Sequence, residues 1–98
     1  MRFKILDPIL HSPLRLAVVS LLMTTRESEF TYLKRETGAT SGNLSVQINK
    51  LGKAGYISIE KKFHNNYPQT TCRITQEGID AFEKYVKALK SYTHPGNA

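Results

Sequence analysis

The chain has 98 residues, of which 40% are hydrophobic, and carries a formal net charge of +6. This length allows one domain with a modest core, because single domains usually have about 100 to 150 residues. No apolar run approaches the roughly 20 residues of a membrane span, no signal peptide is recognisable, and the lone cysteine excludes an intrachain disulfide. We therefore expect a cytoplasmic protein without a membrane partner, with one domain at residues 1–92 and a loose tail at residues 93–98.

The first strong helical signal begins at Ser12 and Pro13, since serine can cap a helix and proline at the first helical position loses no hydrogen bond. The segment from Pro13 to Thr25 is apolar on nearly every side. Such a helix must be buried on more than one side. We expect one side to face the core of the domain and another to face a second subunit.

A polar break at residues 26–29 separates this helix from a second helical pattern that begins at Phe30, with Thr31 available as a cap. Gly38 ends the pattern, because glycine enters the left-handed region without steric cost. After a tight turn, a third helix is expected from Thr40 or Ser41 to about residue 54. Its buried stripe, at spacings of four and three, consists of Leu44, Ile48 and Leu51.

Two alternating segments follow, from Tyr56 to Glu60 and from Thr71 to Thr75, and each is typical of a half-buried strand. The residues between them contain the turn formers Asn and Pro, so we expect a hairpin with a long tip. Thr75 then caps a last helix. Its apolar residues at helical spacing are Ile79, Phe82, Val86 and Leu89.

Two helices joined by a short turn that contains glycine, followed at once by a hairpin, form a helix-turn-helix with a wing. The stretch FTYLKRETGATSGNLSVQINKLGKAGYISI, followed by CRITQEGIDAFEKY, resembles small winged helix-turn-helix transcription regulators of the MarR/ArsR type. The resemblance covers nearly the whole chain and implies an α+β, mainly helical fold with a three-helix core, a β-hairpin wing and a C-terminal dimerisation helix. It also implies a homodimer built from the first and last helices, with the third helix in the major groove of DNA and the wing at the adjacent backbone or minor groove.

The distribution of charge favours a polyanionic partner. Residues 40–73 contain five basic residues and one acidic residue, a net charge of +4, whereas residues 16–39 and 74–98 are each neutral. Outward side chains of the third helix include amides that can pair with adenine, an apolar group for a thymine methyl and hydroxyls sized for phosphate. The predicted recognition-helix residues are Thr40, Ser41, Asn43, Ser45, Val46, Gln47, Asn49 and Lys50.

The predicted wing combines cations and amides, which suit contacts with the DNA backbone and the minor groove. Its predicted DNA-binding residues are Lys61, Lys62, His64, Asn65, Asn66 and Arg73. Related wings often carry arginine at the tip, where this chain has two asparagines, and a solvated hairpin is the alternative interpretation. The residues predicted at the dimer interface are Leu14, Val18, Leu21, Phe82, Val86 and Leu89.

No metal, cofactor or catalytic site is expected. The lone Cys72 and the scattered His11, His64 and His94 lack the spacing of metal ligands, and no nucleophile, phosphate-binding loop or paired carboxylates indicate an enzyme. Cys72 is expected to be a small core residue, with a redox sensor as the alternative.

The sequence therefore predicts a homodimeric regulator that binds double-stranded DNA specifically and acts as a repressor by occlusion. The alternative from another class is a winged-helix module that binds proteins without binding DNA, because fold alone does not dictate function. RNA binding is a third hypothesis, although no aromatic platform supports it.

Overall fold

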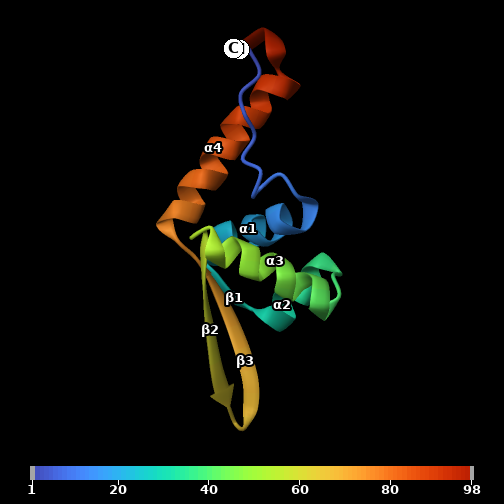
Figure 1. Ribbon diagram of the computed structural model, residues 1–98, viewed down its shortest axis with the longest axis vertical. Helices are drawn as coiled ribbons and strands as arrows, with labels where there is room; N and C mark the ends of the chain where they lie inside the picture. The colour runs from blue at the N-terminus through green and yellow to red at the C-terminus, as the bar shows by residue number, and fades with distance from the viewer. Residues whose placement is uncertain (1, 98) are drawn as a thin grey trace.

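The computed structural model describes residues 2–97 and has the predicted winged helix-turn-helix fold (Figure 1). In chain order the elements are α1 (Pro13–Thr25), β1 (Glu27–Glu29), α2 (Phe30–Thr37), α3 (Ser41–Lys53), β2 (Ile57–His64), β3 (Tyr67–Ile74), α4 (Gln76–Thr93) and the 3-10 helix η1 (Pro95–Asn97). The first three helices cluster in the middle, while the β2–β3 hairpin and α4 project from them in opposite directions. Among the described residues no helix is long and apolar enough to cross a membrane.

Side-chain and glycine caps set the helix boundaries where the sequence predicts them. Thr40 accepts a hydrogen bond from the backbone N–H of Asn43 at 3.2 Å, and Thr75 caps α4 by accepting one from Gly78 at 3.0 Å. Gly38 ends α2 with φ at 70°. The start of α2 differs from the prediction, because the helix begins directly after β1 and Thr31 lies within its first turn.

The polar break after α1 contains a strand that the sequence did not predict. β1 pairs with β3, giving a three-stranded antiparallel sheet in the order β1-β3-β2. An ion pair between Arg73 and Glu27, with 2.6 Å between nitrogen and oxygen, joins directly opposed residues of these strands. A strand of three polar residues carries no hydrophobic alternation, so only its pairing with β3 reveals it.

The wing is longer and its turn tighter than predicted. β2 continues to His64 and β3 begins at Tyr67, which leaves a two-residue turn of Asn65 and Asn66 with φ at 51° and 66°. Asparagine tolerates positive φ, and a turn of this kind matches the twist of paired strands. The expected long tip is therefore wrong. Pro68 is accommodated because β1 pairs with β3 only as far as Thr71.

The core forms where α1, α2, α3 and the base of the sheet meet. Its completely buried side chains are Leu10, Val18, Val19, Leu22, Leu33, Leu44, Leu51 and Cys72. Burial of Cys72 confirms its assignment to the core. On α4 the most buried residues are Gly78, Tyr85, Ala88 and Ser91 rather than the predicted apolar stripe, which is only half-buried.

The N-terminal segment begins beside the C-terminal end of α4 and runs along this helix toward α1 (Figure 1). The backbone N–H of Lys4 donates to Ser91 Oγ at 3.0 Å, and the Tyr92 hydroxyl donates to the carbonyl of Lys4 at 2.8 Å. Closer to the core, the Tyr56 hydroxyl donates to Asp7 Oδ2. η1 lies in the segment for which a loose tail was expected, and residue 98 lies outside the described residues.

Candidate nucleic-acid interface

The face of α3 opposite its buried stripe is not covered by the rest of the domain. Val46 at the centre of this face is 50% exposed, and Asn49 and Lys50 beside it are exposed as well. Of the eight predicted recognition-helix residues, Gln47 alone is half-buried. The face thus combines an apolar centre, an amide and a cation, the side-chain types that read base edges in the major groove.

Gln47 and Asn43 occupy the side of α3 that faces α1. Arg15 donates to Gln47 Oε1 and, at 2.6 Å, to the carbonyl of Ile9. Gln47 Nε2 in turn donates to Asn43 Oδ1 at 3.1 Å. The side-chain amide of Gln47 therefore has a partner at its oxygen and another at its nitrogen, which fixes its orientation.

The opposite side of α3 faces the wing across a shallow hollow. The hollow measures about 270 Å³, and its polar lining consists of Ser41, Ser45, Asn49, Lys61 and Thr70. Ser41 opens α3, where unpaired backbone N–H groups and the helix dipole favour an anion. Two of the three hydroxyls predicted for phosphate, those of Ser41 and Ser45, thus lie around one concave surface with Lys61, whereas Thr40, which caps α3, does not line it.

The two adjacent lysines of β2, Lys61 and Lys62, lie on opposite faces of the hairpin. Lys61 is directly opposite Thr70 and shares its face with Ile59, which packs toward α3. Successive side chains of a strand alternate between faces, so Lys62 lies on the other face. Among the described residues Lys61 has no ion-pair partner.

On the face of the wing that is turned away from α3, here called the outer face, the cations are paired with acidic side chains. Lys62 contacts Glu60 at 2.9 Å, and Arg73 contacts Glu27 at 2.6 Å. The hydrogen bond to Glu60 also raises the pKa of Lys62. Of the predicted wing residues, Lys61 is therefore brought together with α3, whereas Lys62 and Arg73 lie on the face turned away from it.

The predicted tip residues His64, Asn65 and Asn66 are all exposed at the end of the hairpin. Two exposed aromatic residues beside them are absent from the predicted site: Phe63 is 80% exposed and Tyr67 is 75% exposed. The alternation of Ile57, Ile59, Lys61 and Phe63 was the available signal, but the predicted strand ended at residue 60.

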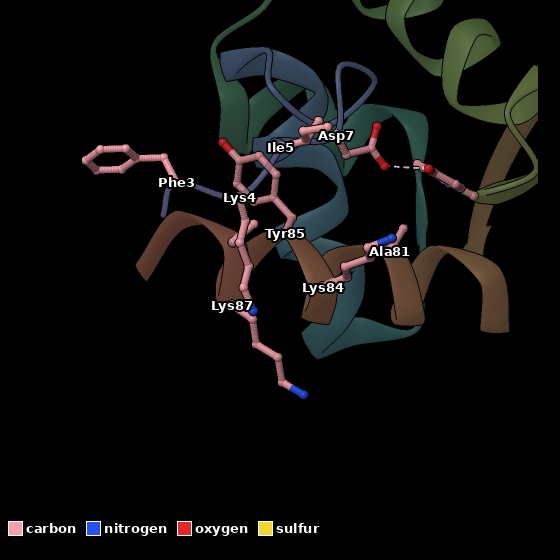
Figure 2. A pocket seen from close by; sticks show the side chains of 10 residues that line it. Phe3, Lys4, Ile5, Asp7, Ala81, Lys84, Tyr85 and Lys87 are labelled. Carbon is pink, nitrogen blue, oxygen red and sulfur yellow. Dashed lines mark hydrogen bonds between the residues drawn. The ribbon is translucent and has the colours of Figure 1, made fainter. Parts of the chain in front are cut away.

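At the other end of the molecule, a hollow of about 760 Å³ lies between the N-terminal segment and α4. Figure 2 shows Tyr85, Lys84 and Lys87 of α4 on one side of it and Asp7, bonded to Tyr56, on another. Nearby, Ile5 is 85% exposed. None of the predicted DNA-binding residues lines this hollow.

Five of the six residues predicted at the dimer interface remain partly exposed in the single chain. They are Leu14, Leu21, Phe82, Val86 and Leu89. Val18 differs, because its side chain is completely buried in the core and has no surface to offer a partner. Within residues 2–97, no group of three or more His, Cys, Asp or Glu side chains is arranged to hold a metal ion.

Comparisons with known proteins agree with this geometry. A family model described as a winged helix DNA-binding domain matches residues 14–93. An uncharacterized protein of Methanocaldococcus jannaschii is 32% identical over 78 residues, which are 80% of this chain and 85% of that protein.

Among solved structures, a transcriptional regulator homologue from Pyrococcus horikoshii OT3 is similar with a TM-score of 0.83 and 26% identity, covering 92% of this chain and 89% of that one. A MepR-like protein solved with pseudoligands has a TM-score of 0.71 at 16% identity, covering 85% of this chain and 61% of that one. The second likeness concerns the fold alone.

Proposed function

Because the chain belongs to the winged-helix DNA-binding domain family of transcription regulators, we propose that it binds duplex DNA sequence-specifically as a homodimer and represses transcription by occlusion. The observation that carries this proposal is the exposed face of α3 around Val46 beside the hollow that contains Lys61. A DNA ligand also agrees with the cytoplasmic location expected from the sequence.

The proposed contacts divide between bases and phosphates. Val46, Asn49 and Lys50 face the base edges of the major groove, which is wide enough to admit a helix. The hydroxyls of Ser41 and Ser45 and the ammonium group of Lys61 surround a concavity suited to the phosphate backbone. In this proposal the residues that face the bases provide the sequence specificity, and the residues around the concavity provide much of the affinity.

The dimer is proposed from apolar surface that one chain leaves uncovered. α4 projects from the core (Figure 1), and Phe82, Val86 and Leu89 on it are only half-buried. Ile5 on the adjoining segment is almost fully exposed. A second copy packed on α4 would cover such surface and set two α3 helices on successive major grooves, about 34 Å apart on a palindromic site.

Binding and assembly are tested separately on the full chain. For binding, the affinity for a duplex selected from a random library is measured against rising salt and against competitor DNA. We expect specific binding that weakens with salt, reduced in Lys50→Ala and unchanged in Lys87→Ala, a control on α4. Stoichiometric capture of a protein with no affinity for any duplex would instead favour the protein-interaction module.

For assembly, light scattering at micromolar concentration gives the mass directly. We expect twice the 11.1 kDa of one chain. Val86→Glu should lower the mass toward that of a monomer, because it would place a charge within the proposed interface. A wild-type chain that remains monomeric would refute the dimer and leave DNA binding by α3 to be judged on its own measurement.

A further inference from the structure

The wing ends in a narrow, well-defined tip. His64 and Tyr67 are directly opposed, and the turn between them has only two residues, both with positive φ. Because the strands pair up to this turn, the side chains near the tip have fixed faces. The pair before it, Phe63 opposite Pro68, lies on the same face as Lys61, and the pair of His64 and Tyr67 lies on the other.

Phe63 is the unusual residue of this tip. It is 80% exposed, although a phenyl side chain gains free energy when it is removed from water. It follows Lys61 by two residues on one strand face, about 7 Å further from the hollow beside α3. A duplex with its major groove on α3 would therefore meet Lys61 first and Phe63 beyond it.

The charge around Phe63 favours a nucleic acid as the partner that covers it. Lys61 lies on the same strand face as Phe63 and has no ion-pair partner among the described residues, whereas the outer-face cations Lys62 and Arg73 are paired with Glu60 and Glu27. Apolar side chains of this kind enter the minor groove by wedging between base pairs, next to cations that hold the backbone.

We propose that Phe63 is a wedge that inserts between two base pairs in the minor groove beside the α3 site, and that Pro68 supports it from the opposite strand. This inference rests on the proposed DNA binding. It makes the wing a reader of how easily a base step unstacks, since flexible pyrimidine–purine steps cost least to open. Tyr67 is also exposed but lies on the other face, and it has no such role.

The experiment uses the full chain and a duplex that the wild-type protein selects from a random library. 2-Aminopurine is placed in turn at each position flanking the selected core, and its fluorescence reports unstacking. We expect wild-type protein to raise the fluorescence at one step in each flank. Phe63→Ala should abolish that rise and weaken binding about tenfold, the order of one stacked aromatic, while the salt dependence stays the same.

Two further variants show whether the effect belongs to an apolar side chain at position 63. Phe63→Leu should retain part of the fluorescence rise, because leucine also wedges, and Tyr67→Ala should behave as wild type. Equal binding and equal fluorescence for wild type and Phe63→Ala on a selected duplex would overturn the wedge and leave the proposed function intact. A lower mass for Phe63→Ala would assign the ring to a protein interface and also overturn it. Failure of wild type to select any duplex would overturn both proposals.

Discussion

The guanidinium group of Arg15 on α1 donates a hydrogen bond to the side-chain carbonyl of Gln47 on α3, while its Nε donates to the carbonyl of Ile9 at 2.6 Å. One side chain thus joins the N-terminal segment, the first helix and the proposed recognition helix. Because Gln47 also bonds to Asn43, the orientation of two amides at the edge of the DNA-binding face depends on a residue outside it.

Arg15→Ala should lower the free energy of unfolding by about 1 to 3 kcal/mol, because hydrogen bonds to a charged group are lost in a partly buried setting. Chemical denaturation measures the change. Arg35→Ala is the matched control: its side chain is 71% exposed and pairs with Glu36 on the surface, so the change should be about 0.5 kcal/mol or less. Equal stabilities of the two variants would show that the Arg15 contacts contribute nothing.

The faces of the wing predict unequal roles for its two adjacent lysines. Lys61→Ala should weaken binding to all duplexes and reduce the slope of log affinity against log salt by about 0.9, the value of one phosphate contact. Lys62→Ala should have a smaller effect, because Lys62 lies on the outer face beside Glu60. The measurement is a salt titration of binding by fluorescence anisotropy. A larger change of slope for Lys62→Ala than for Lys61→Ala would contradict the proposal that DNA lies on the face of the wing that carries Lys61.

Two glycines in helices should respond to alanine with opposite signs. A Cβ at Gly78 would lie 2.1 Å from the carbonyl oxygen of Tyr56, so Gly78→Ala should destabilise the chain by about 1 to 3 kcal/mol. A Cβ at Gly42 meets nothing within 4 Å, and Gly42→Ala should add up to about 1 kcal/mol through helix propensity. Thermal unfolding of both variants checks this, and a stabilised Gly78→Ala would contradict the packing of α4 on the turn before β2.

Much of this fold follows from the sequence because its signals are local. Thr40 and Thr75 cap helices, and Gly38 ends one, through contacts within a few residues. The features that were missed depend on distant partners. β1 exists through pairing with β3, and the stripe of α4 that faces the core was set by contacts of Tyr85 with the N-terminal segment, including a 3.0 Å hydrogen bond to His11.

The candidate site divides in the same way. Residue types and helical spacing place Val46 and Asn49 on the exposed face, as predicted. The difference between Lys61 and Lys62 depends on β2 continuing past residue 60, where the predicted strand ended, and Val18 could be removed from the proposed dimer surface only once its complete burial was known. Amino-acid type alone cannot distinguish Lys61 from Lys62, or a buried from an exposed Val18, because each depends on which residues pack beside it in the folded chain.

Burial of the thiol should make stability depend on pH in the alkaline range. Desolvation raises the pKa of Cys72 from 9.0 to about 11. The thiol of the unfolded chain therefore loses its proton at lower pH than that of the folded chain. The contribution of the buried thiol to the free energy of unfolding is fully present below pH 9 and is lost as the pH rises toward 11. At 1.36 kcal/mol per pKa unit the loss is about 2 to 3 kcal/mol. Denaturation of wild type and Cys72→Ala across this range should show the difference, and parallel curves would contradict it.

Recognition of a DNA sequence by the exposed face of α3 is tested most directly by selecting duplexes from one random library with wild type and with Asn49→Ala. Lys87→Ala on α4 serves as the control. We predict a defined consensus for wild type, the same consensus for Lys87→Ala and an altered preference at one base pair of each half-site for Asn49→Ala. No consensus for wild type, or an unchanged one for Asn49→Ala, would contradict base reading by this face.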